Sequence, residues 1–243
     1  MTNIQSSQDV RQLGTILSVW AHPDDESYSC AGIMAAAMVN GQEIACVTAT
    51  KGEAGVQDES RWPAARLGDI RAAEMREVLK TLGITKHHWL GYADGGCKDV
   101  AEQLAVRQIR SFIDQYQPDS ILTFGPDGMT GHDDHRTVSR WVSLAAAGTA
   151  AHVYHAVQLP DIYASLRQAD EQFNIFFNID KPPLREPEQC AILLRLQDDL
   201  LIQKYRCLCA MPSQTEAMFR EFGQETICTM ICTEAFVRAE ATV

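Results

Sequence analysis

The feature that most constrains the fold is a regular alternation between short apolar runs and longer segments with helical spacing. The apolar, β-branched runs predict strands over residues 15–20, 43–50, 88–90 with its flanks, 120–124 and 152–159, and the segments between them predict helices over 27–40, 66–82, 100–116 and 135–147. Strands that alternate with helices of this length form βαβ units and a mostly parallel sheet covered by helices on both faces. We therefore predict an α/β fold with a Rossmann-like, doubly wound sheet.

The alternation weakens after about residue 160. Beyond that point the sequence predicts a strand over 174–179, a long helix over 187–209 and a last extended stretch over 226–237. Because no repeat, linker or low-complexity segment interrupts the chain, we expect a single domain over residues 1–243. Its core would lie at 14–160, and residues 161–243 would complete the domain and the rim of its pocket.

The predicted topology indicates where a ligand would bind. In the common doubly wound order 3-2-1-4-5 the first and fourth strands are neighbours, and ligands bind in the crevice beyond their carboxyl ends. The loops that follow these two strands are 21–26 and 125–131. They are also the two loops richest in His, Asp and Gly, so we expect the functional site between them.

The first of these loops has the sequence AHPDDE over residues 21–26. His22 and Asp25 offer nitrogen and oxygen ligands that suit Zn²⁺, while Asp24 can point elsewhere. The alternative is helix capping, in which Asp24 or Asp25 caps the helix that follows. Capping accounts for one acid but not for His22 or for a third acid, so the loop favours a functional site.

The second loop has the sequence GPDGMTGHDDHR over residues 125–136. Its three glycines permit close approach of the backbone to a ligand. His132 and His135 are three residues apart, which places them roughly on one face of a helical turn, and Asp134 can hydrogen-bond an imidazole and fix its tautomer. The alternative is a glycine loop before a solvated polar helix start. Three protein ligands with one open position would make a catalytic zinc site, and a further histidine suits acid or oxyanion chemistry.

The charge and the ends of the chain bear on partners and location. With 21 Lys and Arg against 32 Asp and Glu, the net charge is −11, which disfavours binding to nucleic acid or anionic lipid. The N-terminus lacks an apolar signal core, and the longest apolar run, 31–39, is too short to insert across a membrane. Eight irregularly spaced cysteines favour reduced thiols. We expect a cytoplasmic protein with a small-molecule partner; a homo-oligomer is compatible with the sequence.

In these two loops the chain resembles the PIG-L / LmbE-like deacetylases, which include N-acetylglucosaminyl-phosphatidylinositol de-N-acetylases. The family's AHPDDE motif is present whole at 21–26, and its GxxGxxGH element matches 125–132. The second signature, usually HPDH, is HDDH here, with Asp133 where proline is common. Weaker similarities cover much of the remaining chain: Lys51–Gly55, Arg71 with Glu74, Leu90–Gly95, Lys204 with Ser213-Gln214, and Glu234 with Phe236.

The resemblance implies a metal and a base. It implies Zn²⁺, or another divalent metal such as Fe²⁺, bound by His22, Asp25 and His135, with Asp24 as general base. The activity it implies is removal of an N-acetyl group from an amide, with an N-acetylglucosamine-type sugar conjugate as the substrate. Alternatives are a metal-dependent amidase or esterase for a non-sugar substrate, or a non-catalytic ligand-binding module with a Rossmann-like sheet.

Four further residues receive roles from the same resemblance. It implies that His132 stabilises the oxyanion or acts as an acid, oriented by Asp134, and that Arg71 and Asp94 contact substrate hydroxyls. Without the resemblance, Arg71 would be a helix-surface charge and Asp94 a turn former. The chain departs from the family where Met211-Pro212 precede Ser213-Gln214, because a histidine is common there. This departure leaves the C-terminal wall of the pocket, and hence the substrate, open.

Overall fold

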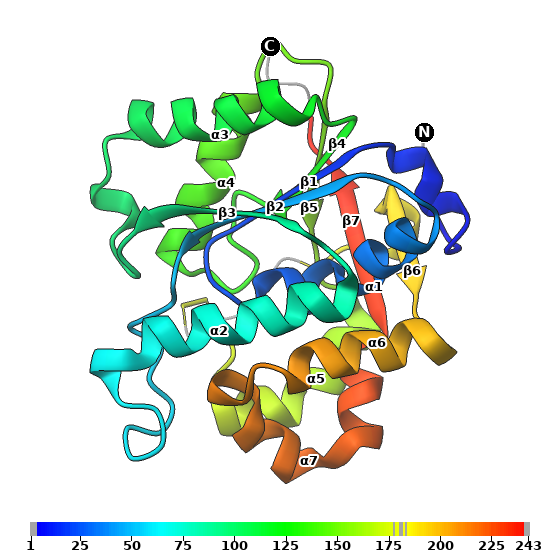
Figure 1. Ribbon diagram of the computed structural model, residues 1–243. Coiled ribbons are helices and arrows are strands. Elements are labelled where there is room, and N and C mark those ends of the chain that lie inside the picture. Colours follow the sequence, from blue (N-terminus) through cyan, green and yellow to red (C-terminus); the bar gives the residue numbers. More distant parts are fainter. Residues whose placement is uncertain (1–3, 177, 180–181, 183, 241–243) are drawn as a thin grey trace.

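The computed structural model describes residues 4–176, 178–179, 182 and 184–240. Across these residues the fold centres on a seven-stranded sheet with the order β3-β2-β1-β4-β5-β7-β6 (Figure 1). The strands are β1 Ile16–Trp20, β2 Ile44–Thr50, β3 Lys86–Tyr92, β4 Ser120–Phe124, β5 His152–Ala156, β6 Ile192–Arg195 and β7 Thr233–Arg238. Strands β1 to β5 are parallel, and β7 and β6 extend the sheet in antiparallel pairing. The predicted α/β class and the order 3-2-1-4-5 are confirmed.

Helices cover both faces of the sheet, as predicted. Helices α3 Glu102–Tyr116 and α4 Asp133–Ala146 pack together on one face, and α1 Asp25–Val39, α2 Ala64–Leu82 and α6 Asp198–Cys209 pack on the other (Figure 1). Every residue of β1, β2 and β4 is buried, which is typical of parallel strands covered on both faces. Helix α2 ends at Gly83, whose φ of 76° lies in the left-handed region that glycine adopts without steric cost.

Several predictions beyond residue 160 are wrong. Residues 160–173, for which we predicted no element, form helix α5 Pro160–Phe173. The predicted strand at 174–179 is absent from the described residues of that range, which form turns and irregular backbone; residue 177 lies outside the described residues. The predicted helix at 187–209 divides into the 3-10 turn η3 Pro187–Gln189, β6 and α6. The predicted extended stretch at 226–237 contains the end of helix α7 Pro212–Ile231 and then β7.

Long-range strand pairing explains the division of the predicted helix. The apolar run Ile192–Leu194 suits either a strand or one side of a helix, so its sequence alone does not decide. In the structure Ile192 lies opposite Phe236 of β7, and Leu194 lies opposite Glu234. The partner strand is about forty residues away, beyond the reach of any local pattern.

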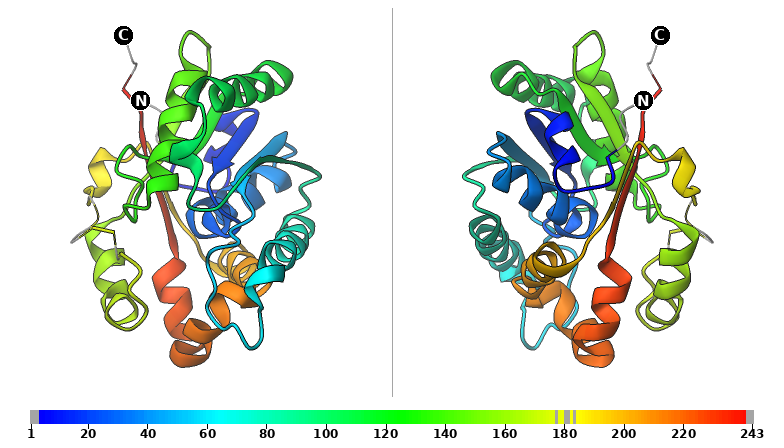
Figure 2. Two further views of the ribbon diagram at one scale, coloured as in Figure 1. Left: turned by 90° about the vertical axis from the view of Figure 1, so that its left-hand side faces the viewer. Right: turned by 90° about the vertical axis from the view of Figure 1, so that its right-hand side faces the viewer.

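The C-terminal part of the chain lies at the carboxyl ends of the parallel strands. Helix α6 packs on α1 and α2, and α5 and α7 pack side by side below the sheet, where β7 leads away from α7 (Figures 1 and 2). The loops at 21–26 and 125–131 follow β1 and β4, so they lie at this same edge of the sheet. Within the described residues, no helix combines the length and apolarity needed to cross a membrane.

Candidate active site

The two loops singled out in the sequence meet at the edge of the sheet. Strands β1 and β4 pair in parallel, so their carboxyl ends lie side by side. His22 Nδ1 lies 3.1 Å from His135 Nε2, and the Asp25 carboxylate lies 3.6 Å from the first atom and 3.4 Å from the second. Ligands placed tetrahedrally about 2.0–2.2 Å from a metal are about 3.3–3.6 Å apart. The three side chains therefore fit a divalent metal.

A turn of unusual geometry brings Asp25 to this position. Asp24 has a φ of 123°, a strained conformation for a residue with a side chain. The backbone N–H of His22 donates to Asp25 Oδ2 at 2.7 Å, so the loop folds back on the first residue of α1. Within the described chain, Asp24 occupies the N-cap position without a side-chain capping hydrogen bond. The capping alternative for Asp24 is therefore wrong, because its carboxylate turns toward the site.

A pair of carboxylates holds the other nitrogen of His22. Its Nε2 lies 3.0 Å from Asp94 Oδ1 and 3.3 Å from Asp134 Oδ2. Asp134 is fully buried and also accepts hydrogen bonds from the backbone N–H groups of Gly95 and Cys97. Burial alone would raise the pKa of Asp94, but the hydrogen bond with His22 holds it at about 2. Both acids thus stay ionised and direct Nδ1 of His22 toward the site.

Among the residues that the structure describes, two overlapping groups of side chains have the spacing of metal ligands. One contains His22, His132 and His135, and the other contains His22, Asp94 and Asp134. The carboxylates of the second group already accept several N–H hydrogen bonds, so this group resembles the outer carboxylates that orient a metal-bound histidine. The candidate metal position is therefore the one on the Nδ1 side of His22, near His135.

His135 is oriented by the glycine loop. Its Nδ1 lies 3.0 Å from the carbonyl oxygen of Gly128, which fixes the proton on Nδ1 and leaves the Nε2 lone pair for the site. Its ring stacks on Phe124 with the centroids 4.0 Å apart. Gly128 has a φ of 76°, and a Cβ there would lie 3.1 Å from the His135 Cβ. A side chain at residue 128 would therefore disturb the ring.

His132 occupies the N-cap position of α4. Its Nδ1 accepts the backbone N–H of Asp134 at 3.1 Å, so the neutral ring carries its proton on Nε2. Burial and the neighbouring His22 lower the pKa of His132, which favours this neutral form. His132 also lines the cavity, so it is placed to offer an N–H to a ligand. Asp134 thus contacts His132 through its backbone, whereas its carboxylate contacts His22.

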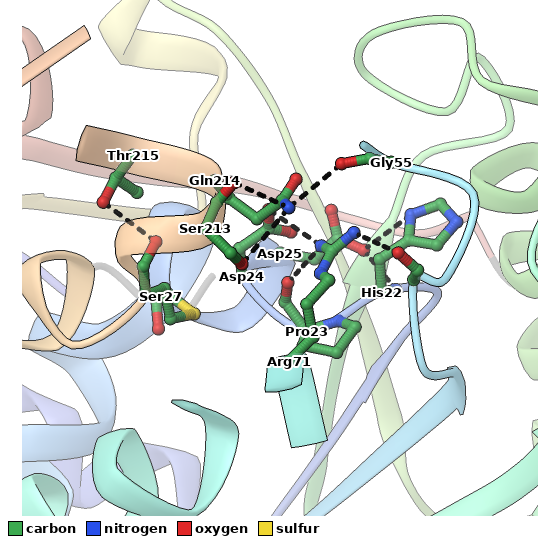
Figure 3. Close-up of polar contacts among 12 residues, drawn as sticks. His22, Pro23, Asp24, Asp25, Ser27, Gly55, Arg71, Ser213, Gln214 and Thr215 are labelled. Carbon is green, nitrogen blue, oxygen red and sulfur yellow. Dashed lines mark hydrogen bonds and ion pairs between the residues drawn. The ribbon is translucent and has the colours of Figure 1, made fainter. Parts of the chain in front are cut away.

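Arg71 lies next to Asp24 and contacts its carboxylate (Figure 3). Its Nη2 lies 3.1 Å from Asp24 Oδ2 and 2.6 Å from the Pro23 carbonyl oxygen, and its Nη1 donates to the Gly52 carbonyl at 2.8 Å. Burial raises the pKa of Asp24 and the Arg71 cation opposes this, leaving a pKa of about 7. The guanidinium therefore holds the Asp24 carboxylate in position and favours its ionised form.

Comparison with known proteins identifies the family of this chain. The PIG-L family profile, described as GlcNAc-PI de-N-acetylase, matches residues 17–146, more than half of the chain and both loops. The chain belongs to the PIG-L family. A 1D-myo-inositol 2-acetamido-2-deoxy-alpha-D-glucopyranoside deacetylase from Mycolicibacterium gilvum is 32% identical over 158 residues, covering 56% of this chain and 55% of that protein. The chain thus spans about half the length of this relative.

Solved structures of low sequence identity share the fold. N,N'-diacetylchitobiose deacetylase from Pyrococcus horikoshii aligns with a TM-score of 0.62 and 20% identity, covering 94% of this chain and 85% of that one. A 4-carboxy-2-hydroxymuconate hydratase from Pseudomonas putida aligns with a TM-score of 0.59 and 15% identity, covering 95% and 98%. Because a hydratase has the same fold, the fold alone does not identify the reaction. The function must be inferred from the side chains at the site.

The structure also identifies supporting residues for which no role was predicted. The fully buried Glu26 accepts the backbone N–H of the strained Asp24 at 3.2 Å. Glu74 of α2 accepts both the N–H and the hydroxyl of Ser213. Gln214 Nε2 donates to the Gly55 carbonyl at 3.1 Å (Figure 3). These contacts fasten the start of α7 to the site. Their signals in the sequence are the third acid of AHPDDE and the weak family similarities.

The predicted substrate contacts also border the site. Arg71 and Asp94 both line a cavity of about 520 Å³ that contains the candidate metal position. Arg71 is 4% exposed and Asp94 contacts His22 and the backbone N–H of Ala54, so each is already engaged with the protein. Support of Asp24 and His22 is the role that these contacts favour.

Proposed function

We propose that this PIG-L family protein is a metal-dependent N-deacetylase that hydrolyses the amide of an N-acetylated amino-sugar conjugate. The observation that carries the proposal is the convergence of His22 Nδ1, His135 Nε2 and the Asp25 carboxylate beside an Asp24 held by Arg71. The related deacetylase, whose name specifies a 2-acetamido sugar joined to inositol, supports the substrate class.

His22, Asp25 and His135 would hold the metal, for which we propose Zn²⁺, with Fe²⁺ as the alternative. Such a metal polarises an acyl oxygen and lowers the pKa of bound water to about 7. The donor set of two imidazoles and one carboxylate is a common catalytic zinc set that leaves a coordination position open. The deprotonated acids around His22 balance the added charge.

Asp24 is the proposed general base. Its carboxylate is held from behind by Arg71 and lines the cavity beside the metal position. A pKa of about 7 suits a group that must accept a proton from the attacking water and return it to the leaving amine near neutral pH. The strained backbone at residue 24 and the Glu26 contact keep the carboxylate in this place.

His132 is the proposed donor to the acyl oxygen. The backbone N–H of Asp134 donates to Nδ1, so the neutral ring carries its proton on Nε2, and His132 lines the cavity in which an oxyanion would develop. Arg71 and Asp94 remain proposed hydroxyl contacts from the cavity wall, in addition to their support of Asp24 and His22.

Two broader proposals concern the whole chain. We propose that residues 161–243 belong to the same domain as 14–160 and form the pocket rim, because β7 and β6 continue the sheet and α5 and α7 contribute to the cavity. We also propose a cytoplasmic location. All eight cysteines lie within the described chain as free thiols, which suits a reducing compartment.

The test is an acetate-release assay with the metal-loaded protein. The substrates are N-acetylglucosamine, its inositol and methyl glycosides, a non-sugar acetamide and an acetyl ester, each with and without a chelator. We expect chelator-sensitive release that is fastest from the sugar amides. Asp24→Asn should keep the metal and lose at least 10³-fold in kcat, an effect at the upper end of a general base. Asp133→Asn, at an exposed position next to Asp134, is the matched control.

Distinct outcomes separate the rivals. Faster turnover of the acetyl ester or the non-sugar acetamide would replace the sugar-amide proposal with the esterase or amidase alternative. A metal-loaded protein that releases no acetate from any of them, or a fully active Asp24→Asn variant, contradicts the proposed deacetylase or its base.

A further inference from the structure

The cavity beside the candidate metal position has two chemically different walls. One wall is polar and includes Gln57, Arg71, Asp94 and Gln214. The other is apolar and includes Ile162, Leu166 and Phe173 of α5, Phe176 just after it, and Met218 and Met230 of α7. Both walls belong to the same cavity of about 520 Å³.

The order of the strands places these walls on opposite sides of the metal position. His22 and His135 follow β1 and β4, the central pair of the parallel strands. In the polar wall, Gln57 and Asp94 lie in the loops after β2 and β3 and Arg71 lies in α2, all on one side of that pair, while Gln214 lies at the start of α7. The apolar wall follows β5 and precedes β7, on the other side, where α5 and α7 pack together (Figure 2). The amide bond to be hydrolysed would therefore lie between the polar half and the apolar half of the cavity.

An N-acyl amino sugar has the same two-sided chemistry. Its amine side carries hydroxyl groups, and its acyl side carries only carbon and hydrogen beyond the carbonyl. Hydroxyls find hydrogen-bond partners on the polar wall, whereas a buried hydroxyl left without a partner on the apolar wall is costly. Acetyl has a single methyl group and would leave most of the apolar wall uncovered.

The side chains of the apolar wall are partly buried and partly open to the cavity, as the side chains of a binding surface are. Ile162, Phe176 and Met230 are 8%, 5% and 5% exposed and form the buried floor of this wall. Leu166 and Met218 are only half-buried and border the cavity. The polar exceptions among the described residues that line this side are Gln158, Asn174, Thr233 and the Lys204–Glu234 pair, whose charges bind each other at 2.9 Å. A linear alkyl chain fits such a surface better than a second sugar or an inositol.

We propose that this wall binds the acyl chain of the substrate, so that an amino sugar N-acylated with a medium-length chain is turned over faster than its N-acetyl counterpart, which remains a substrate. The proposal rests on the proposed amide hydrolysis and specifies its acyl group. Water adds across the amide bond, which releases the free fatty acid and the amino sugar. Each methylene moved from water to an apolar wall favours binding by roughly fourfold when fully buried.

The test compares glucosamine N-acylated with acetyl, butanoyl, hexanoyl and octanoyl groups, using the metal-loaded protein and release of the free amine as the readout. We expect kcat/KM to rise at least tenfold from acetyl to hexanoyl. A second series keeps the N-acetyl group and lengthens the alkyl aglycone from methyl to octyl. There we expect less than a threefold change, because the aglycone lies on the amine side.

Substitutions on two separate helices test the wall itself. Met218→Gln, nearly equal in length, and Leu166→Asn should each lower the hexanoyl-to-acetyl ratio of kcat/KM by fivefold or more. Because the ratio is measured within one protein sample, partial misfolding does not change it. Glu171→Gln, at an exposed position of α5, is the matched control and should leave the ratio unchanged.

Three outcomes would overturn the proposal. Efficient turnover of N-acetylglucosamine with a hexanoyl rate tenfold lower rejects the acyl assignment while the deacetylase proposal stands. A rise confined to the alkyl aglycone series rejects it in favour of a lipid-like aglycone. No amine release from any compound rejects the amide hydrolysis on which the inference rests.

Discussion

The Nζ atom of Lys204 lies 2.9 Å from Oε1 of Glu234, and both side chains are almost completely buried where α1 breaks. Cys30 interrupts the helix with φ −149° and ψ 19°. Lys204 donates to the Tyr28 carbonyl, in the first half of the helix, and the Glu234 carboxylate accepts the N–H groups that begin the second half at 2.8 and 2.7 Å. The ion pair thus caps both new helix ends and fixes the half that carries Asp25.

The first prediction concerns this ion pair. Lys204→Met leaves the Glu234 carboxylate buried without its cation, so we expect the free energy of unfolding to fall by about 3–5 kcal/mol in urea titrations. The double variant Lys204→Met/Glu234→Gln should recover part of that loss. Lys51→Met breaks the exposed pair with Asp69 and should cost no more than about 1 kcal/mol. A loss below about 1 kcal/mol for Lys204→Met would show that the pair does not support the break.

The second prediction concerns the pH dependence of turnover. As the proposed base, Asp24 must be ionised, so we expect activity to fall as pH drops through its pKa. Since the Arg71 cation lowers that pKa, Arg71→Gln should move the acidic limb of kcat/KM to higher pH by about one unit or more. Arg71→Lys keeps the charge and should shift it less, and Arg66→Gln, exposed on the same helix, should not shift it. An unmoved limb in Arg71→Gln would rule out Asp24 as the titrating base.

Local patterns predicted the fold well where strands are buried on both faces. The predicted strand at 15–20 is β1 Ile16–Trp20, and the one at 120–124 is β4 with the same bounds, because continuous apolar runs between turns have few other solutions. Helix α5 was missed although Ile162, Leu166 and Ala169 have helical spacing. Strand β6 was not predictable locally, since its structure depends on β7.

For the candidate site, the sequence predicted which side chains come together but not the contacts between them. The predicted strand order by itself places the loops of His22 and His135 side by side. The Asp134 carboxylate contacts His22 because the loop after β3 meets the start of α4. There the N–H groups of Gly95 and Cys97 donate to this carboxylate and hold it in place. No sequence pattern encodes that meeting, because the three segments lie far apart along the chain.

The third prediction concerns metal uptake. Burial lowers the pKa of His22, but its hydrogen bonds with Asp134 and Asp94 outweigh this and raise it to about 10. A metal must therefore displace a proton, so affinity should rise about tenfold per pH unit between pH 6 and 8. Chelator competition at several pH values measures the slope. Equal affinity at pH 6 and pH 8 would mean that Nδ1 of His22 is not a ligand.

The fourth prediction concerns stability in acid and a residue away from the site. His87 Nε2 lies 3.0 Å from the Thr48 hydroxyl, and burial, with a smaller contribution from the charge of His88, lowers the pKa of His87 to about 4. An unfolded histidine titrates near 6.5, so between pH 6.5 and 4 the unfolded chain binds more protons. Folding stability contributed by the neutral ring is thus complete above about pH 6.5 and is lost as pH falls toward 4.

The size of this loss follows from the shift, and one substitution isolates it. A displacement of that size corresponds to on the order of 3 kcal/mol between pH 7 and pH 4. His87→Gln keeps a hydrogen-bonding group near Thr48 but cannot take up the proton, so its free energy of unfolding should fall less steeply over this range. His152→Gln, at an exposed position on β5, is the control. Urea titrations at pH 7, 5.5 and 4.5 measure the slopes, and parallel slopes for His87→Gln and the parent protein would show that His87 titrates normally in the folded chain.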